Sequence, residues 1–214
     1  MKLHLGCGQK YLKGYINIDY PMIKHTVQSK MIADIEADIL KLKYKKSTVA
    51  EIRLHHLFEH FPRAVACALV GSWNSWLIKE GILRIEVPDF DRSVKSYFSP
   101  FASKKKKGVV LRHIFGSQEA PWAIHFNGWT ENQLKDLMGI AGYKITEVKR
   151  NSYKGTYNIE VFAVKITDLS NNDYLKDSKA FLSNYLVDNS ETEKIMLKVW
   201  MNELREQIAK SWGN

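Results

Sequence analysis

The chain has 214 residues, of which 45% are hydrophobic and 26% are charged, and its formal net charge is +9. These values are ordinary for a soluble globular domain with a sizeable core, and the absence of any run of about 18 apolar residues excludes a transmembrane helix. Two cysteines, Cys7 and Cys67, exclude a disulfide framework and favour a reducing compartment. Because a strand pattern begins at Lys2, we expect no signal peptide and a cytoplasmic location, which for a viral protein would be the host cytoplasm.

The positive charge has two interpretations. Lysines gather at 41–46 and at 104–107, a pattern that is typical of solvated loops but also of surfaces that bind polyanions. We favour solvated loops, and we keep nucleic acid, an anionic substrate and a membrane surface as alternatives.

The first part of the chain predicts short strands separated by turns. The predicted strands are 2–5, 15–18, 31–37 and 50–57. The gap between the first two is too short for a crossover with a full helix, so the first helix should be reduced to a turn. Gly6 and Gly8 allow a sharp turn and a close approach to a ligand, and Asp19 is placed to accept hydrogen bonds from a ribose diol. Asp19 lies only 11 residues after Gly8, which departs from the dinucleotide-binding fingerprint.

The middle of the chain alternates helix and strand patterns. Apolar residues recur at helical spacing over 64–78, and Gly81 is expected to end that helix. The next predicted segments are a strand at 82–87, a short helix at 91–98, a basic polar loop at 99–108 and an irregular aromatic segment at 113–129. This order predicts an α/β sheet that binds ligands at the carboxyl ends of its strands.

The last part of the chain predicts a helix, a hairpin and two further helices. These elements are a capped helix from Thr130 to Gly142, strands at 143–150 and 157–166 joined by a Lys154-Gly155 turn, and helices near 178–187 and 191–211. No catalytic motif falls in the final helices. We therefore expect an α/β domain over residues 1–166 and a helical extension over residues 167–214.

Several short segments, specific in their order and spacing, carry a family resemblance. They are Leu3-His4-Leu5-Gly6-Cys7-Gly8, Gly14-Tyr15-Ile16-Asn17-Ile18-Asp19, Asp38-Ile39 with Leu42, His56-Leu57-Phe58-Glu59-His60, Leu77 to Asp89, and Ala141-Gly142-Tyr143. Over residues 2–166 the chain resembles class I S-adenosylmethionine-dependent methyltransferases. More narrowly, it resembles the small methyltransferases found beside glycosyltransferases in surface-polysaccharide clusters, and in large viruses and phages. Ile82 departs from that pattern, which usually has a second glycine there.

The resemblance implies a Rossmann-like methyltransferase fold of the α/β class. Its sheet would be mostly parallel with an antiparallel C-terminal hairpin, its first helix truncated, and its C-terminal extension helical. The implied cofactor is S-adenosylmethionine, with S-adenosylhomocysteine as the product. The glycine turn would line the methionine end, Asp19 would hold the ribose and Asp38 the adenine amino group, with Asp34 open as the alternative to Asp38. The residues assigned to the cofactor are Leu5, Gly6, Cys7, Gly8, Asp19, Tyr20, Asp38, Ile39, His55, His56 and Leu57.

The resemblance also implies a sugar hydroxyl of a surface glycan, or of its precursor, as the methyl acceptor. A base that takes the hydroxyl proton adds roughly 10²–10⁴-fold to the rate. We rank His125 first as that base, followed by His60, His113 and Asp91. Aromatic faces stack on sugar rings, so the residues expected to bind the acceptor are Asp89, Arg112, Trp122 and Trp129. A glycosyltransferase is the expected partner or fused domain, and the oligomeric state stays open.

Two alternatives belong to other classes of protein. His56 to His60 formally matches H-x-x-E-H, an inverted zinc-protease motif, but that motif needs its histidines on one helix. Here a strand leads in and Pro62 follows, so we predict no metal. The positive charge suggests a nucleic-acid methyltransferase or a non-catalytic binding module, yet the motifs typical of amino-group and cytosine C5 methylation do not occur. Nucleic acid is therefore disfavoured, and a protein or small-metabolite acceptor stays open.

Overall fold

The computed structural model describes residues 1–21 and 30–212, which contain a seven-stranded sheet of order β3-β2-β1-β4-β5-β7-β6. The parallel strands are β1 (Lys2–Leu5), β2 (Ile16–Asp19), β3 (Ile35–Glu36), β4 (Val49–His55) and β5 (Leu77–Pro88). The antiparallel strands are β6 (Tyr143–Tyr153) and β7 (Thr156–Lys165), and β7 also pairs with β5. Because the carboxyl ends of the parallel strands meet at one edge, residues from distant parts of the chain come together there.

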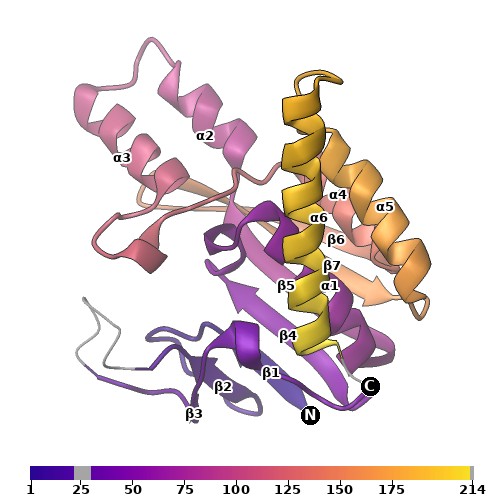
Figure 1. The fold of residues 1–214 in the computed structure, drawn as a ribbon. Helices are drawn as coiled ribbons and strands as arrows, with labels where there is room; N and C mark the ends of the chain where they lie inside the picture. Colours follow the sequence, from indigo (N-terminus) through magenta and orange to yellow (C-terminus); the bar gives the residue numbers. More distant parts are fainter. Residues whose placement is uncertain (22–29, 213–214) are drawn as a thin grey trace.

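Four helices gather on one face of the sheet (Figure 1). They are α1 (Arg63–Trp76), α4 (Glu131–Ile140), α5 (Asn171–Ser183) and α6 (Glu191–Ser211). After β5, α2 (Phe90–Tyr97) and α3 (Lys104–Phe115) form a helical hairpin that projects beyond the carboxyl edge of the sheet (Figure 1). Within the described residues, no helix combines the length and the hydropathy that a bilayer span requires.

Alternation along the strands gives the sheet one apolar and one polar face. The apolar face carries Leu3, Leu5, Ile52, Leu54, Leu83 and Ile85, all completely buried. The opposite face carries His4, Arg53 and Arg84 in register on three neighbouring strands. Glu160 of β7 accepts a hydrogen bond from Arg84 and lies 3.9 Å from Arg53. The polar face is thus held by charged pairs rather than by apolar packing.

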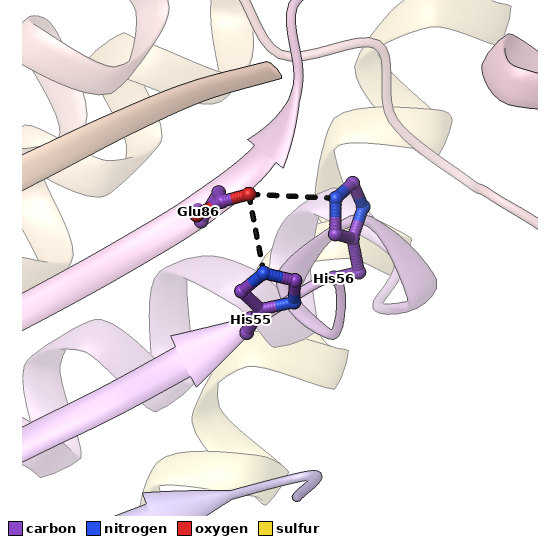
Figure 2. A group of neighbouring side chains, drawn as sticks. All are labelled: His55, His56 and Glu86. Carbon is purple, nitrogen blue, oxygen red and sulfur yellow. Dashed lines mark ion pairs between the residues drawn. The ribbon is translucent and has the colours of Figure 1, made fainter. Parts of the chain in front are cut away.

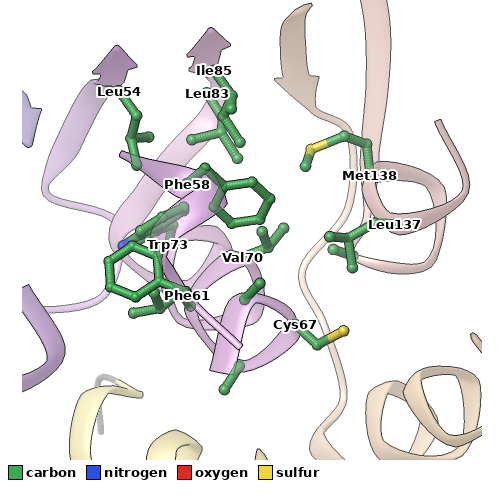
Figure 3. Packing of buried hydrophobic residues seen from close by; sticks show 14 of the residues in the cluster. Leu54, Phe58, Phe61, Cys67, Val70, Trp73, Leu83, Ile85, Leu137 and Met138 are labelled. Carbon is green, nitrogen blue, oxygen red and sulfur yellow. The ribbon is translucent and has the colours of Figure 1, made fainter. Parts of the chain in front are cut away.

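Helix α1 lies between the sheet and the C-terminal helices, which explains why almost all its residues are buried. Trp73 is completely buried and packs on Phe58, with the ring centroids 6.0 Å apart. Figure 3 shows both rings within the cluster that joins β4 and β5 to α4. Trp73 and Trp76, which share the helical spacing of the 64–78 segment, therefore belong to the core.

Helix α6 is hydrogen-bonded directly to α1 and to the segment that precedes β4. Trp76 donates its indole N–H to the carbonyl of Ser211 at 2.9 Å, and the Ser72 and Ser211 hydroxyls are 2.7 Å apart. Gln207 donates to the carbonyl of Leu40 at 2.8 Å. The predicted boundary at 166/167 thus falls between β7 and α5 in sequence, while in space α5 and α6 pack on α1.

The reduced first helix is confirmed, since only turns join β1 to β2. The basic loop predicted at 99–108 is wrong, because α3 begins at Lys104. Its N-cap is Ser103, whose hydroxyl accepts from the Lys106 N–H at 3.2 Å, and lysine itself is a good helix former. Helix α3 also includes His113, which was expected in an irregular segment.

Other predicted bounds need correction. Helix α1 ends at Trp76 rather than Gly81, and the residues between them begin β5. Pairing shifts where Leu77 opposes Val49, and Glu80 lies in the left-handed region (φ 62°), so an irregular stretch was interpreted as a helix end. The strand expected at 31–37 is only Ile35–Glu36. Helix α5 begins at Asn171, seven residues before the predicted start, because Ser170 caps it.

Candidate functional site

A cavity of about 680 Å³ opens at the carboxyl ends of β1, β2 and β4. Ten of the predicted cofactor residues line it: Gly6, Cys7, Gly8, Asp19, Tyr20, Asp38, Ile39, His55, His56 and Leu57. Leu5 does not, because it points to the apolar face of the sheet and is completely buried. Further lining residues that the prediction omits are Gln9, Lys10, Ala37, Leu40, Phe61 and Pro62. Most of them adjoin predicted positions in sequence.

The glycine turn forms the floor of this cavity. Gly6 and Gly8 both adopt positive φ, 65° and 54°. The Gly8 N–H donates to Oδ2 of Asp19 and the Tyr20 N–H to Oδ1, both at 2.8 Å, so Asp19 ties the turn to the end of β2. Burial, with the charges of Asp19 and Asp34, raises the pKa of Cys7 to about 12. The Cys7 thiol is therefore a neutral part of the wall and not a nucleophile.

The two acids left open for adenine lie in different places. Asp38 lines the cavity beside Ile39, and its Oδ1 accepts from the Leu40 N–H at 3.0 Å. Asp34 is not a lining residue; it accepts from the Asn17 backbone at 2.8 Å and from the Tyr11 hydroxyl at 3.1 Å. Asp38 is thus the acid placed to meet a ligand, and Asp34 braces β2.

Five of the seven histidines gather beside the cavity, with two buried glutamates that the prediction omits. Figure 2 shows His55 and His56 turned toward Glu86, with Nε2 atoms 3.2 and 3.7 Å from Oε1. Nδ1 of His56 lies 3.2 Å from Glu59. Burial opposes a charge on His56, but the hydrogen bond to Glu59 and the charges of both glutamates outweigh it and raise the pKa of His56. Burial likewise opposes ionisation of Glu86, yet His55, Asn151 and His56 lower the pKa of Glu86 to about 2.

Glu59 is completely buried and joins His56 to a second pair of histidines. Oε1 of Glu59 lies 3.9 Å from Nε2 of His125, and the rings of His125 and His60 are 4.6 Å apart. Burial raises the pKa of Glu59, but the hydrogen bond from His56 and the nearby histidine charges outweigh it, so this pKa lies below its ordinary value. Burial lowers the pKa of His125. The neutral form of His125 therefore faces a carboxylate.

The residues predicted for acid–base chemistry fall at different depths. His60 lines the cavity, and His125 lies directly behind it. His113 is on α3, where its Nε2 lies 3.0 Å from the Tyr157 carbonyl and its ring 5.9 Å from that of His56. Asp91 is exposed on the first turn of α2 and is not a lining residue. The geometry brings the histidines together and leaves Asp91 outside.

Of the residues predicted to bind the acceptor, Trp122 alone lines the cavity. Trp129 is 1% exposed and stacks on Phe58, so it belongs to the core and has no free face for a sugar. Asp89 is buried as the N-cap of α2, where it accepts from the Arg92 N–H at 3.0 Å. Arg112 is exposed on α3. Position in sequence near the aromatic segment was therefore a poor guide to position at the cavity.

The two omitted glutamates had signals in the sequence. Glu86 is a charged residue between two apolar ones, Ile85 and Val87, in the strand predicted at 82–87. Glu59 is the acid of the H-x-x-E-H pattern that was set aside as a zinc-protease motif. A charged side chain is rarely buried without a partner, so both positions pointed to histidine partners.

No protein-family model matches the chain, and no curated protein matches it. Solved structures do match. A chain of the Haloferax volcanii complex between the Trm112 methyltransferase activator and a methyltransferase has a TM-score of 0.53 at 13% identity, over 79% of this chain and 83% of that one. The Burkholderia thailandensis 1,6-didemethyltoxoflavin-N1-methyltransferase, solved with 1,6-didemethyltoxoflavin and S-adenosylhomocysteine, has a TM-score of 0.52 at 11% identity, over 78% and 71%. The chain therefore has the Rossmann-like methyltransferase fold that the sequence predicted.

Proposed function

We propose that this chain is an S-adenosylmethionine-dependent methyltransferase that methylates a sugar hydroxyl of a surface glycan or its precursor. The main support for this cofactor is that the Gly6–Gly8 turn, Asp19 and Asp38 all line one cavity. The Burkholderia enzyme of the same fold was solved with S-adenosylhomocysteine, which supports this choice. The sugar rests on the sequence resemblance and on the aromatic ring of Trp122.

The residues present fit this cofactor. A cavity of about 680 Å³ is within the usual range for sites of this kind, roughly 300–1,000 Å³. Asp19 and Asp38 supply acceptors for ribose hydroxyls and an adenine amino group, and Ile39 and Leu57 supply apolar surface. When bound, the cofactor supplies a methyl group that is already activated on a sulfonium.

The protein's part in the reaction is to orient the acceptor and remove its proton. Alignment of an oxygen with the methyl group supplies most of the rate in such a transfer. Trp122 and His60 both line the cavity, and we infer that a sugar against Trp122 would bring a hydroxyl to the group of Glu59, His60 and His125. We therefore assign proton removal to this group, with His60 ahead of His125 because His60 lines the cavity.

Calorimetric titration with S-adenosylhomocysteine tests the cofactor. We expect saturable binding with one site per chain; the absence of binding would overturn the proposal. Transfer of labelled methyl groups to glycosides, RNA, peptides and small heteroaromatic compounds tests the acceptor. Labelling of RNA or peptide without labelling of any sugar would replace the acceptor class and leave the cofactor assignment in place.

Gly6→Ala is expected to weaken S-adenosylhomocysteine binding at least about tenfold and to lower stability by about 1–2 kcal/mol or more. A Cβ at Gly6 would lie 2.9 Å from Leu57, a cavity residue, and would hold a left-handed conformation. Gly14→Ala is the matched control, because Gly14 has φ +86° but nothing within 4 Å of its Cβ position. Urea unfolding and calorimetry measure both effects. Equal binding by the two variants would contradict the role of Gly6 in the floor.

A further inference from the structure

Glu59, His60 and His125 form a group whose donor atoms converge. Each residue offers one donor atom, and these atoms lie within 4.8 Å of one another. The Glu59 carboxylate is completely buried, and its Oε2 atom has no hydrogen-bond partner among residues 1–21 and 30–212. A buried, ionised oxygen without a partner is strongly unfavourable. His56 lies 3.2 Å from Oε1, so Oε2 is the oxygen for which the described side chains provide no donor or cation.

Both histidines are held in the way that metal-binding histidines are held. Nδ1 of His60 lies 3.1 Å from the Ile124 carbonyl, and Nδ1 of His125 lies 3.1 Å from the His113 carbonyl. A carbonyl only accepts hydrogen bonds, so each Nδ1 carries a proton, and in the neutral ring Nε2 is the nitrogen with a free lone pair. Donation of the second ring N–H to a carbonyl fixes this tautomer and the direction of the ring in metal sites.

The spacing within the group suits a metal ion better than a hydrogen bond. Nε2 of His125 is 3.9 Å from Oε1 of Glu59, which exceeds hydrogen-bonding distance. Ligands lie about 2.0–2.2 Å from zinc, so two tetrahedral ligand atoms are about 3.3–3.5 Å apart. A contraction of about 0.5 Å would place both atoms around one ion. Oε1 is also held by His56 at 3.2 Å, which orients the carboxylate.

The neighbouring group of His55, His56 and Glu86 provides a contrast. Its members are also close enough for a metal ion, but their polar atoms already pair with one another. Glu86 Oε1 lies 3.2 Å from His55, and Asn158 donates to the same oxygen at 3.4 Å. Hydrogen bonds within and around this second group already pair its polar atoms, so it has less need of a cation.

We propose that Glu59, His60 and His125 bind a divalent transition-metal ion of the zinc class. Two imidazoles and one carboxylate favour Zn²⁺, Co²⁺, Ni²⁺ or Fe²⁺ over Mg²⁺ and Ca²⁺, which prefer sets of oxygen ligands. Three protein ligands leave a coordination position open. This group differs from the zinc-protease pattern excluded from the sequence, since it uses His125 from a distant segment and omits His56.

The consequence for catalysis rests on the proposed function. His60 lines the cavity, so an ion held by His60 would lie beside the space in which an acceptor would bind. A bound Zn²⁺ lowers the pKa of a coordinated oxygen acid by several units. The group assigned to proton removal would then act by acidifying the hydroxyl, and His60 and His125 would serve as ligands.

Titration of chelator-treated protein with Co²⁺ tests the site, because the visible d–d absorption of Co²⁺ reports low-coordinate nitrogen and oxygen ligation. We expect a saturable spectrum at one ion per chain that Zn²⁺ displaces. His60→Gln and His125→Gln should each weaken Co²⁺ binding at least about 100-fold, a loss at the upper end of the range seen when merely supporting residues are removed. His55→Gln, the matched change in the contrasting group, should alter it less than about threefold.

The outcomes separate this proposal from the methyltransferase assignment. No Co²⁺ spectrum in the wild type would overturn the metal site, as would a loss in His55→Gln equal to that in His125→Gln. Circular dichroism shows which variants fold, and the two partly exposed histidines keep the test valid if Glu59→Gln does not fold. S-adenosylhomocysteine binding, measured on the same samples, reports the cofactor site independently of the metal.

Discussion

Asp19→Ala is expected to weaken S-adenosylhomocysteine binding at least about 100-fold. The Asp19 carboxylate accepts from the Gly8 and Tyr20 N–H groups at the end of β2, and it lines the cavity. A hydrogen bond to a charged group contributes about 1.5–3 kcal/mol, and 1.4 kcal/mol corresponds to a tenfold change in affinity. Loss of a bidentate contact with the ribose therefore predicts the stated change. Isothermal calorimetry measures it directly.

The matched control is Asp34→Ala. Asp34 also braces the end of β2, through the Asn17 backbone and the Tyr11 hydroxyl, but it does not line the cavity. We expect this variant to lose stability while its affinity for S-adenosylhomocysteine changes less than about threefold. Equal losses of affinity in both variants would mean that Asp19 acts only by supporting the glycine turn.

A chain that ends at Asp168 is expected not to fold. This truncation removes six buried apolar side chains from α5 and α6: Tyr174, Phe181, Leu182, Met201, Leu204 and Ile208. Each contributes roughly 1.5–3 kcal/mol by burial, so the loss is of the order of the whole stability of a domain, about 5–15 kcal/mol. The partner of the Trp76 indole is lost as well. Circular dichroism and gel filtration of the truncated chain measure the result.

Point variants in α6 measure how much individual buried side chains of this helix contribute to stability. Leu204 is completely buried and Val199 is 57% exposed on the same helix. Leu204→Ala should lower the free energy of unfolding by about 2–5 kcal/mol, and Val199→Ala by no more than about 0.5 kcal/mol. If the chain of residues 1–168 folds and binds S-adenosylhomocysteine as the full chain does, α5 and α6 form a separable extension.

The predictable parts of the fold were those where local and tertiary preferences agree. The strand Leu3–Leu5, the glycine turn and Asp19 were correctly placed because two strands and a turn leave the chain few alternatives. The errors lie where one local signal had two meanings. Lys104 to Lys107 were taken as a loop from their charge, although Ser103 was a good helix cap. Gly81 was taken as a helix end, although it lies in a strand after an irregular stretch.

Position at the cavity was predictable for the residues assigned to the cofactor and less so for those assigned to the acceptor. Cofactor positions follow short motifs at the ends of successive strands, so their distance in sequence fixes their distance in space. Acceptor positions depend on how the segment between β5 and α4 folds back. In the folded segment Trp129 is buried against Phe58 and Trp122 lines the cavity. Neither position could be predicted, because the segment has no clear periodicity.

The segment between β5 and α4 begins and ends at neighbouring positions in the fold. The Phe90 N–H donates to the Trp129 carbonyl at 3.2 Å, so the two ends of this 90–129 segment meet at one hydrogen bond. Both helices of the projecting hairpin lie between these ends (Figure 1), and the sequence places Trp122 there too. Insertions whose ends lie close together disturb the host fold little. If the proposed function holds, Trp122 and His125 on the acceptor side belong to one insertion, and related chains could change acceptor by exchanging it while the sheet stays the same.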